Sequence, residues 1–260
     1  MRNIVTISIL ALVLLLCSSS KLEYRKAYKL RTVVIDAGHG GKDIGCNGKV
    51  SHEADVALTL AKQVGSLIEK NLPDVKVVYT RTDDTFVELI DRAGIANKNN
   101  ADLFISIHLN AGPPSAFGTE TYTMGLHTTN GNLAVAKREN AVILQEDDYK
   151  EKYGGFDPNS PQSHIMFALH QSAYIDNSLR FAQKVENEFK TRVGRTSRGV
   201  KQAGFLVLWK SYMPSVLIEA GFLTNPTEEK FLNDKTGQTY MASGIYRAFK
   251  EYKQELEAMN

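Results

Sequence analysis

Residues 33–41 read VVIDAGHGG, and this stretch decides the fold of the chain. The apolar run that begins at Val33 stops at Asp36, and glycines follow at positions 38, 40 and 41. A short apolar run that ends in glycines is typical of a buried parallel strand leading into a loop. Similar runs predict further strands at residues 75–79, 103–107, 205–208 and 216–218.

Helical patterns alternate with these strands. Apolar residues at helical spacing predict a helix over residues 53–70. Thr85, with Glu88 three residues later, predicts a capping box and a helix that continues to residue 96. Two more helices are predicted over residues 174–192 and 238–257. Alternation of this kind, without an internal repeat, predicts an α/β fold in which helices cover a mainly parallel sheet.

Composition narrows the class of protein further. The 260 residues are 43% hydrophobic and 23% charged, which is typical of a globular domain and excludes disordered and fibrous classes. The net charge is only +2, and no basic stripe is visible, so we expect no nucleic-acid partner. Two cysteines cannot form a disulfide framework or a cysteine-rich metal site. Any catalytic chemistry must therefore use histidine and carboxylate side chains.

The first twenty residues differ from the rest. Arg2 precedes an almost unbroken apolar run over residues 4–16, which is shorter than the roughly 20 residues of a transmembrane helix. We interpret residues 1–20 as a secretory signal peptide, and we expect export to the periplasm or cell envelope. The Leu-Leu-Leu-Cys sequence at Cys17 is similar to a lipoprotein signal, although Leu16 stands where a small residue is usual. The sequence allows two outcomes: secretion without a lipid, or a lipid on Cys17. Such a lipid would be the only link to the membrane.

Residues 140–171 interrupt the alternation of strands and helices. The segment is polar and rich in turn residues, and it is longer than an ordinary connection. We interpret it as an insertion within a single catalytic domain that spans residues 32–255. It is either a solvated surface excursion or a lid over the functional site.

Polar side chains stand where the predicted strands end. His39, His108 and Glu219 each follow an apolar run, and Glu53 opens the first helix. In parallel sheets, ligands bind outside the carboxyl ends of the strands, so these four segments can converge on one edge of the sheet.

Two imidazoles and one carboxylate with an open fourth position form a catalytic zinc shell. We therefore expect His39, Glu53 and His108 to bind one Zn²⁺ per chain, since imidazole suits zinc better than magnesium. Glu219 would be the general base that takes a proton from water and passes it to the leaving amine. Each residue has a simpler alternative: a histidine at a strand end is often an ordinary polar residue, and Glu53 could serve only the dipole of its helix.

Several long motifs, in order, resemble those of one enzyme family. The chain is similar to the zinc-dependent N-acetylmuramoyl-L-alanine amidases, of the type that acts in bacterial cell separation, over about residues 32–252. The matching segments are VIDAGHGGKD at 34–43, Glu53, TRTDD at 80–84, ADLFISIHLNA at 101–111 and LIEAGFLTN at 217–225.

The resemblance implies a substrate, a fold and a set of roles. The substrate would be the amide bond between N-acetylmuramic acid and L-alanine in peptidoglycan. The fold would be a mixed, mostly parallel twisted sheet with helices on both faces. The zinc ligands of the family fall on His39, Glu53 and His108, and its catalytic glutamate falls on Glu219. Asn110 would contribute to substrate binding, whereas Arg81 and Arg92 are as well explained by structural roles.

The resemblance also suggests regulation. Some members of the family carry an inserted helix that covers the zinc until a partner protein displaces it. The 140–171 insertion would then be autoinhibitory, with Glu146, Asp147 and Asp148 as capping carboxylates and an activator protein as partner. Two other functions remain open: a zinc peptidase acting on the stem peptide, and a non-catalytic wall-binding regulator.

Overall fold

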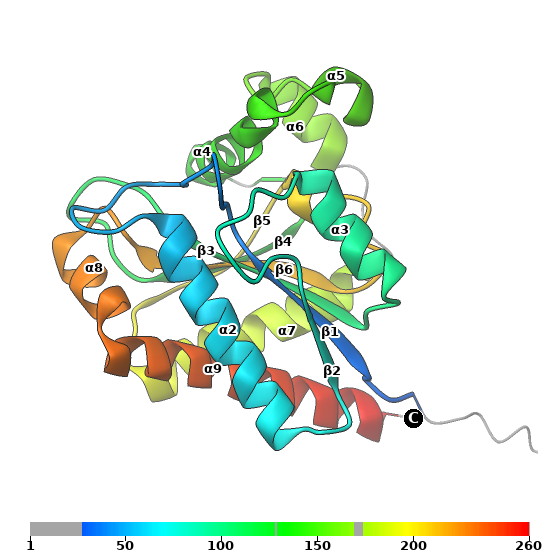
Figure 1. The fold of residues 1–260 in the computed structure, drawn as a ribbon, viewed down its shortest axis with the longest axis vertical. Coiled ribbons are helices and arrows are strands. Elements are labelled where there is room, and N and C mark those ends of the chain that lie inside the picture. Colours follow the sequence, from blue (N-terminus) through cyan, green and yellow to red (C-terminus); the bar gives the residue numbers. More distant parts are fainter. Residues whose placement is uncertain (1–27, 128, 169–173, 260) are drawn as a thin grey trace, which may run out of the picture.

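The computed structural model describes residues 28–127, 129–168 and 174–259. The predicted signal peptide at 1–20, with Cys17, lies outside these residues. Figure 1 shows one sheet with helices packed around it, and the strand order is β2-β1-β3-β6-β4-β5. The strands are β1 (Thr32–Ala37), β2 (Lys76–Tyr79), β3 (Leu103–Asn110), β4 (Thr119–Met124), β5 (Ser197–Ala203) and β6 (Ser215–Phe222).

The sheet is mixed and mostly parallel, as expected. Strands β2, β1, β3 and β6 run parallel to one another, whereas β4 pairs antiparallel with β6 and parallel with β5. The carboxyl ends of β1, β3 and β6 therefore meet at one edge. In the register between β3 and β6, His108 lies beside Glu219.

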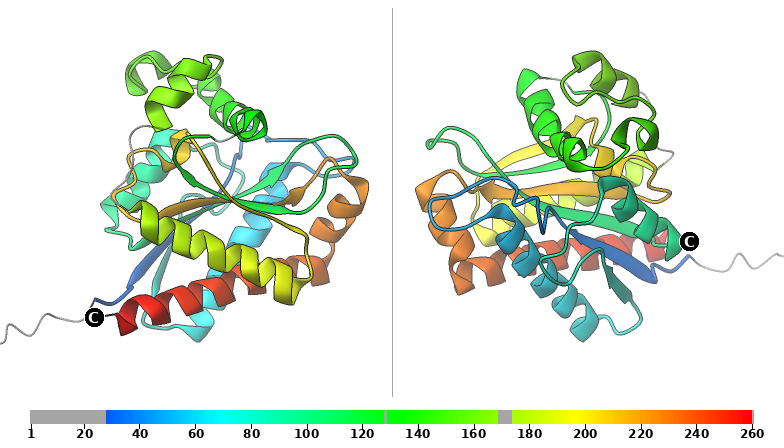
Figure 2. Two further views of the ribbon diagram at one scale, coloured as in Figure 1. Left: turned by 180° about the vertical axis from the view of Figure 1, so that it is seen from behind. Right: turned by 45° about the horizontal axis from the view of Figure 1, so that its top comes forward.

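Helices cover both faces of the sheet, which confirms the predicted architecture. One face packs against α2 (Glu53–Asn71), α7 (Ile175–Glu188) and α9 (Lys235–Ala258), whose apolar side chains meet those of β1, β3 and β6. Figure 2 shows α7 and α9 side by side across this face. The other face packs against α3 (Leu89–Lys98) and α4 (Asn130–Asn140). Alternate residues of β1 pack in the two hydrophobic cores on opposite faces of the sheet. Val33 and Ile35 pack in the core with α2, and Val34 packs in the second core with α3.

Several predicted elements were wrong or missing. The strand predicted at 205–208 is a short 3-10 helix, Leu206–Leu208, that covers the second core. Strands β4 and β5 were not predicted, because they are rich in threonine, lysine and glutamine rather than apolar. Helices α4 and α8 (Pro226–Asn233) were also missed. The predicted capping box does not form, since the Thr85 hydroxyl bonds Asp83 and α3 begins only at Leu89.

The segment after α4 forms short helices at the carboxyl edge of the sheet. They are η1 (Ala141–Gln145), α5 (Tyr149–Lys152) and α6 (Pro161–Ala168), and Figure 1 shows α4, α5 and α6 grouped at that end of the molecule. The segment is not merely solvated, because Tyr153 and Phe156 are buried in the second core. Among the described helices, none is both long and apolar enough to cross a membrane.

Candidate metal centre

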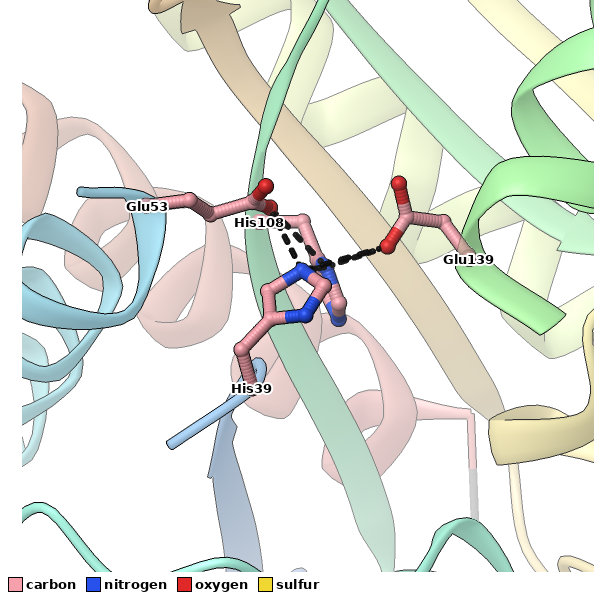
Figure 3. A group of neighbouring side chains, drawn as sticks. All are labelled: His39, Glu53, His108 and Glu139. Carbon is pink, nitrogen blue, oxygen red and sulfur yellow. Dashed lines mark hydrogen bonds and ion pairs between the residues drawn. The ribbon is translucent and has the colours of Figure 1, made fainter. Parts of the chain in front are cut away.

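Four buried side chains meet at the carboxyl edge of the sheet. His39 lies in the loop after β1, Glu53 is the first residue of α2, His108 lies in β3, and Glu139 lies near the end of α4. Figure 3 shows the two carboxylates on opposite sides of the two imidazole rings. The structure thus brings together the three ligands predicted from the sequence. It also adds a fourth residue that was not predicted.

The five distances that involve a histidine nitrogen are close to those of a tetrahedral metal site, and all four donor atoms lie within 4.8 Å of one another. Four ligands held at about 2.0–2.1 Å from zinc lie about 3.3 Å from one another. His39 Nε2 lies 3.0 Å from Glu53 Oε1, 3.3 Å from Glu139 Oε2 and 3.1 Å from His108 Nδ1. His108 Nδ1 lies 3.1 Å from Glu53 Oε1 and 3.0 Å from Glu139 Oε2. Two imidazoles with two carboxylates also suit the preferences of zinc, so the residues present fit this metal.

The backbone of the loop after β1 is held by two buried arginines. His39 has a left-handed backbone, with φ of 60°, which needs support in a residue other than glycine. Arg92 Nη2 donates to the His39 carbonyl at 2.9 Å, and Arg81 Nη2 donates to the Gly38 carbonyl at 2.7 Å. The Asp43 carboxylate lies 2.7 Å from His39 Nδ1 and orients the ring so that Nε2 faces the cluster. Both arginines therefore shape the site without entering it.

Glu53 and His108 are fixed by their immediate surroundings. The two carboxylate oxygens of Glu53 accept hydrogen bonds from the backbone N–H groups of Leu109 (2.9 Å) and Cys46 (2.9 Å). The His108 ring lies against Gly38, where an added Cβ would come within 2.5 Å of it. Glu53 is fully buried at this junction, and its contacts with both imidazoles give it a role beyond the helix dipole.

The electrostatic potential of the cluster favours cations. Burial alone would lower the pKa of His39, but the charge of Glu53 and hydrogen bonds to Asp43 and Glu139 outweigh it and raise the pKa well above its usual value. Burial is likewise outweighed at His108, where Glu139 and Glu53 raise the pKa to about 9. A site that favours protonated imidazoles also favours a metal dication, whose binding displaces those protons.

Asp36 and Arg92 form a buried ion pair beneath the loop. Arg92 Nη1 lies 2.8 Å from Asp36 Oδ1, and Thr80 and Ser106 each donate a hydroxyl to Asp36 at 2.6 Å. Burial alone would raise the pKa of Asp36, but Arg92 and the two hydroxyls outweigh it and lower the pKa. The stabilisation is therefore present above the unfolded pKa of about 3.9, and it is lost as the pH falls through the lower folded value.

We expect Asp36→Ala to reduce the free energy of unfolding by about 3–5 kcal/mol at pH 7, because it leaves the Arg92 charge buried without a partner. Urea unfolding followed by circular dichroism measures this loss. Asp91→Ala, at the exposed neighbour of Arg92, is the matched control and should change stability by at most about 0.5 kcal/mol. A loss below about 1 kcal/mol in Asp36→Ala would show that the ion pair does not support the loop.

Glu219 and Asn110 lie beside the cluster. Glu219 is fully buried, and its Oε2 atom has no hydrogen-bond partner. Burial, together with the neighbouring charge of Glu139, raises the pKa of Glu219 well above its usual value. Arg138 Nη2 lies 3.3 Å from Glu219 Oε1 and 3.1 Å from Asn110 Oδ1. The structure thus places both residues in one site, as the sequence suggested.

Glu139, rather than the three predicted capping carboxylates, meets the histidines. Glu146 accepts hydrogen bonds from the Leu89 N–H (3.1 Å) and the Tyr153 hydroxyl (2.8 Å) at the start of α3. Asp147 and Asp148 are exposed. The fourth corner, expected to be open, is therefore filled by a carboxylate from α4. No strand end marks Glu139 in the sequence, so only the packing of α4 reveals it.

Comparisons with known proteins agree with this geometry. Residues 33–251 match the family model described as N-acetylmuramoyl-L-alanine amidase. The chain is 35% identical over 230 residues to N-acetylmuramoyl-L-alanine amidase AmiA of Escherichia coli, covering 87% of this chain and 77% of AmiA. The crystal structure of an N-acetylmuramoyl-L-alanine amidase from Clostridium difficile 630 superposes with a TM-score of 0.64 at 32% identity, covering 86% of this chain and 97% of that one. The CwlD amidase from Clostridioides difficile, solved in complex with the GerS lipoprotein, has a TM-score of 0.63 at 25% identity, covering 86% and 99%.

Proposed function

The chain belongs to the N-acetylmuramoyl-L-alanine amidase family, and from this premise we propose that it is a zinc-dependent enzyme with a regulated active site. The activity itself, hydrolysis of the amide between N-acetylmuramic acid and L-alanine in peptidoglycan, follows from the family and its relatives. The observation that carries the zinc proposal is the set of five distances of 3.0–3.3 Å that join the His39 and His108 nitrogens to each other and to one oxygen each of Glu53 and Glu139.

We assign His39, Glu53 and His108 as the lasting zinc ligands. When bound, zinc supplies Lewis acidity toward the scissile carbonyl and the water that attacks it. Asp43 keeps His39 in the tautomer whose Nε2 faces the cluster. The arginines at 81 and 92 hold the loop through its backbone carbonyl groups.

Glu219 is the proton carrier in this proposal. Its unpartnered Oε2 atom accepts a proton from the attacking water, and the carboxyl group then donates that proton to the leaving nitrogen of L-alanine. A buried carboxyl group with a raised pKa is suited to holding the proton between the two transfers. The reaction releases a glycan carboxylate and a stem peptide with a free amino terminus.

Product analysis tests the proposed function. We expect mass spectrometry of digested peptidoglycan to show glycan strands without peptides, together with intact stem peptides. A chelator should abolish the reaction and added zinc should restore it. Shortened stem peptides would instead indicate a peptidase, and binding without release of fragments would indicate a wall-binding regulator.

We further propose that α4 is an autoinhibitory element. Glu139 fills the position that a catalytic zinc site keeps open for water or substrate, so α4 must withdraw before the substrate can bind. Contacts made by the following segment keep it closed: Lys152 binds Glu88 (2.7 Å), and Glu146 and Tyr153 accept the first N–H groups of α3. An activator protein that competes for these contacts would open the site. The complex of CwlD with GerS shows that one relative of this chain binds a partner protein.

Glu139→Ala should raise the basal rate of peptidoglycan cleavage by about tenfold or more, because it removes a charged contact that favours the closed state. Dye release from labelled sacculi, measured without any partner, checks this. Glu151→Ala, at an exposed position of α5, is the control and should leave the rate unchanged. A Glu139→Ala protein that loses both zinc and activity would show that Glu139 is a lasting ligand instead.

We propose the cellular location of the protein from the location of its substrate. Peptidoglycan lies outside the cytoplasmic membrane, which agrees with export directed by residues 1–20. We retain both a released enzyme and one anchored by a lipid on Cys17. Mass spectrometry of the mature amino terminus distinguishes them. Cell separation is the process in which we propose that it acts.

A further inference from the structure

In the active site, one nitrogen atom of Arg138 lies within 3.3 Å of three carboxylate or amide oxygen atoms. Arg138 Nη2 lies 3.3 Å from Glu219 Oε1, 3.1 Å from Asn110 Oδ1 and 2.9 Å from Glu139 Oε1. Arg138 Nη1 also donates to the Ala111 carbonyl at 3.3 Å. When α4 withdraws, Arg138 leaves with Glu139, and the oxygens of Glu219 and Asn110 remain. They can then receive another N–H group at the same point.

The amide of Asn110 can point in only one direction. Its Nδ2 atom donates to Glu120 Oε2 at 3.2 Å, and its Oδ1 atom accepts from the Ala111 N–H at 2.9 Å. A carboxylate can only accept hydrogen bonds, and a backbone N–H can only donate, so the reverse orientation would lose both bonds. Asn110 therefore presents an acceptor, not a donor, toward Glu219.

Glu120 is itself held firmly. It is 2% exposed and lies directly opposite Glu219 in the antiparallel pairing of β4 with β6. The Tyr122 hydroxyl donates to Glu120 at 2.6 Å, Lys201 Nζ lies at 2.7 Å, and Arg198 also bonds it. Burial alone would raise the pKa of Glu120, but these bonds outweigh it and lower the pKa. Glu120 thus stays an ionised acceptor for Asn110.

The leaving nitrogen of an amide needs two partners at once. As the C–N bond breaks, its electron pair stays on the nitrogen and takes the proton that Glu219 carries. The N–H already on that nitrogen needs an acceptor, because a buried donor without a partner is costly. Glu219 and Asn110 Oδ1 stand around one point in this arrangement, as the contacts of Arg138 show.

We propose that Asn110 Oδ1 accepts the N–H of the scissile amide, and that Glu120 is a positioning residue that keeps this oxygen facing the substrate. The inference rests on the proposed amidase function and deepens it. It makes the site selective for a bond whose leaving atom carries a hydrogen. It also describes Arg138 as a side chain that occupies the place of the substrate nitrogen in the closed state.

A substrate pair tests the proposal directly. One compound is a muramyl peptide with the natural amide, and the other carries an ester oxygen in place of the scissile N–H. Asn110→Ala should lower kcat/KM for the amide by about 10- to 100-fold, and for the ester by less than about threefold. Any loosening of α4 by the loss of the Asn110–Arg138 bond affects both compounds equally, so it cancels in the ratio. Equal losses on the two compounds would overturn the proposal.

Glu120 variants test the positioning role. Glu120→Ala should reproduce the amide-selective loss of Asn110→Ala, and Glu120→Gln should recover part of it, because glutamine keeps an acceptor oxygen for Asn110. Glu186→Gln is the matched control, because this carboxylate is equally buried but bonds Thr119 and Thr121 on the other side of β4. The ratio of kcat/KM for the amide to kcat/KM for the ester should therefore stay at the wild-type value. A Glu120→Ala protein with bound zinc and the wild-type ratio would exclude the positioning role.

The outcome separates this inference from the proposed function. If zinc-loaded Glu139→Ala protein, which lacks the carboxylate that closes the site, cleaves neither compound nor peptidoglycan, the proposed function fails. If that protein cleaves the amide but not the ester, binding replaces cleavage as the readout. The affinities of both compounds are then measured for Glu219→Gln protein with and without Asn110→Ala. A loss of affinity for the amide compound alone supports the inference, and an equal loss for both compounds rejects it.

Discussion

Glu219→Gln is expected to lower kcat by about 10²- to 10⁴-fold, which is the range for loss of general acid–base catalysis. Glutamine has nearly the same volume as glutamate and can still accept from Arg138, but it cannot carry a proton. Zinc content and thermal stability should therefore remain close to those of the wild-type protein. The measurement is the initial rate of cleavage of a soluble muramyl peptide by protein of known zinc content.

Two controls sharpen this test. Glu186→Gln removes a buried carboxylate of α7 that bonds β4 outside the site, and it should keep full activity. Because the closed state limits access in every variant, the comparison should be repeated in the Glu139→Ala protein. Full activity of a folded, zinc-loaded Glu219→Gln protein would falsify the catalytic role of Glu219.

His39→Ala is expected to abolish activity by preventing stable zinc binding. The substitution removes one ligand and also leaves the Asp43 carboxylate without its imidazole partner. The loss of zinc affinity should exceed the roughly 10- to 100-fold that follows from loss of an outer hydrogen-bond partner alone. Asp43→Asn, which alters only that outer partner, should fall within this range. Competition with a coloured chelator measures both affinities.

The same experiment has a stability readout that does not depend on catalysis. A ligand present at 1,000 times its Kd stabilises the folded state by about 4.1 kcal/mol. Zinc should therefore raise the Tm of the wild-type protein and leave that of His39→Ala almost unchanged. His52→Ala, at an exposed histidine near the cluster in sequence, should behave like the wild type. Retention of one tightly bound zinc in His39→Ala would mean that the ion lies elsewhere.

The predicted zinc shell and the observed cluster of side chains differ in a way that matters for regulation. A three-ligand shell with an open corner describes a working enzyme, whereas four protein ligands describe a closed site. Glu139 and Arg138 are adjacent in α4, and they approach two different parts of the site: the ligand histidines and Glu219. Withdrawal of one helix would therefore free the metal and the proton carrier together.

The sequence determined the parts of this protein that depend on local pattern. Short apolar runs ending in glycine or polar residues predicted the strands β1, β3 and β6, and the polar residues at their ends predicted His39, His108 and Glu219. This works because a buried parallel strand must be apolar along its length, and all such strands end at one edge of the sheet. The same reasoning missed β4 and β5, where Thr121 of β4 bonds Glu186 and Lys201 of β5 bonds Glu120, partners that are distant in the chain.

Only the tertiary structure decided what closes the site and what orients its acceptor. Glu139 is separated from His39 by a hundred residues of sequence, and it meets that histidine because α4 packs its apolar side on the second core. Glu146 looked equally suitable as a capping carboxylate, yet the N–H groups of α3 provide it with other partners. The sequence does not distinguish one carboxylate from another. Their roles differ because a buried carboxylate must be paired with a donor or cation, and the tertiary structure determines which one lies within reach.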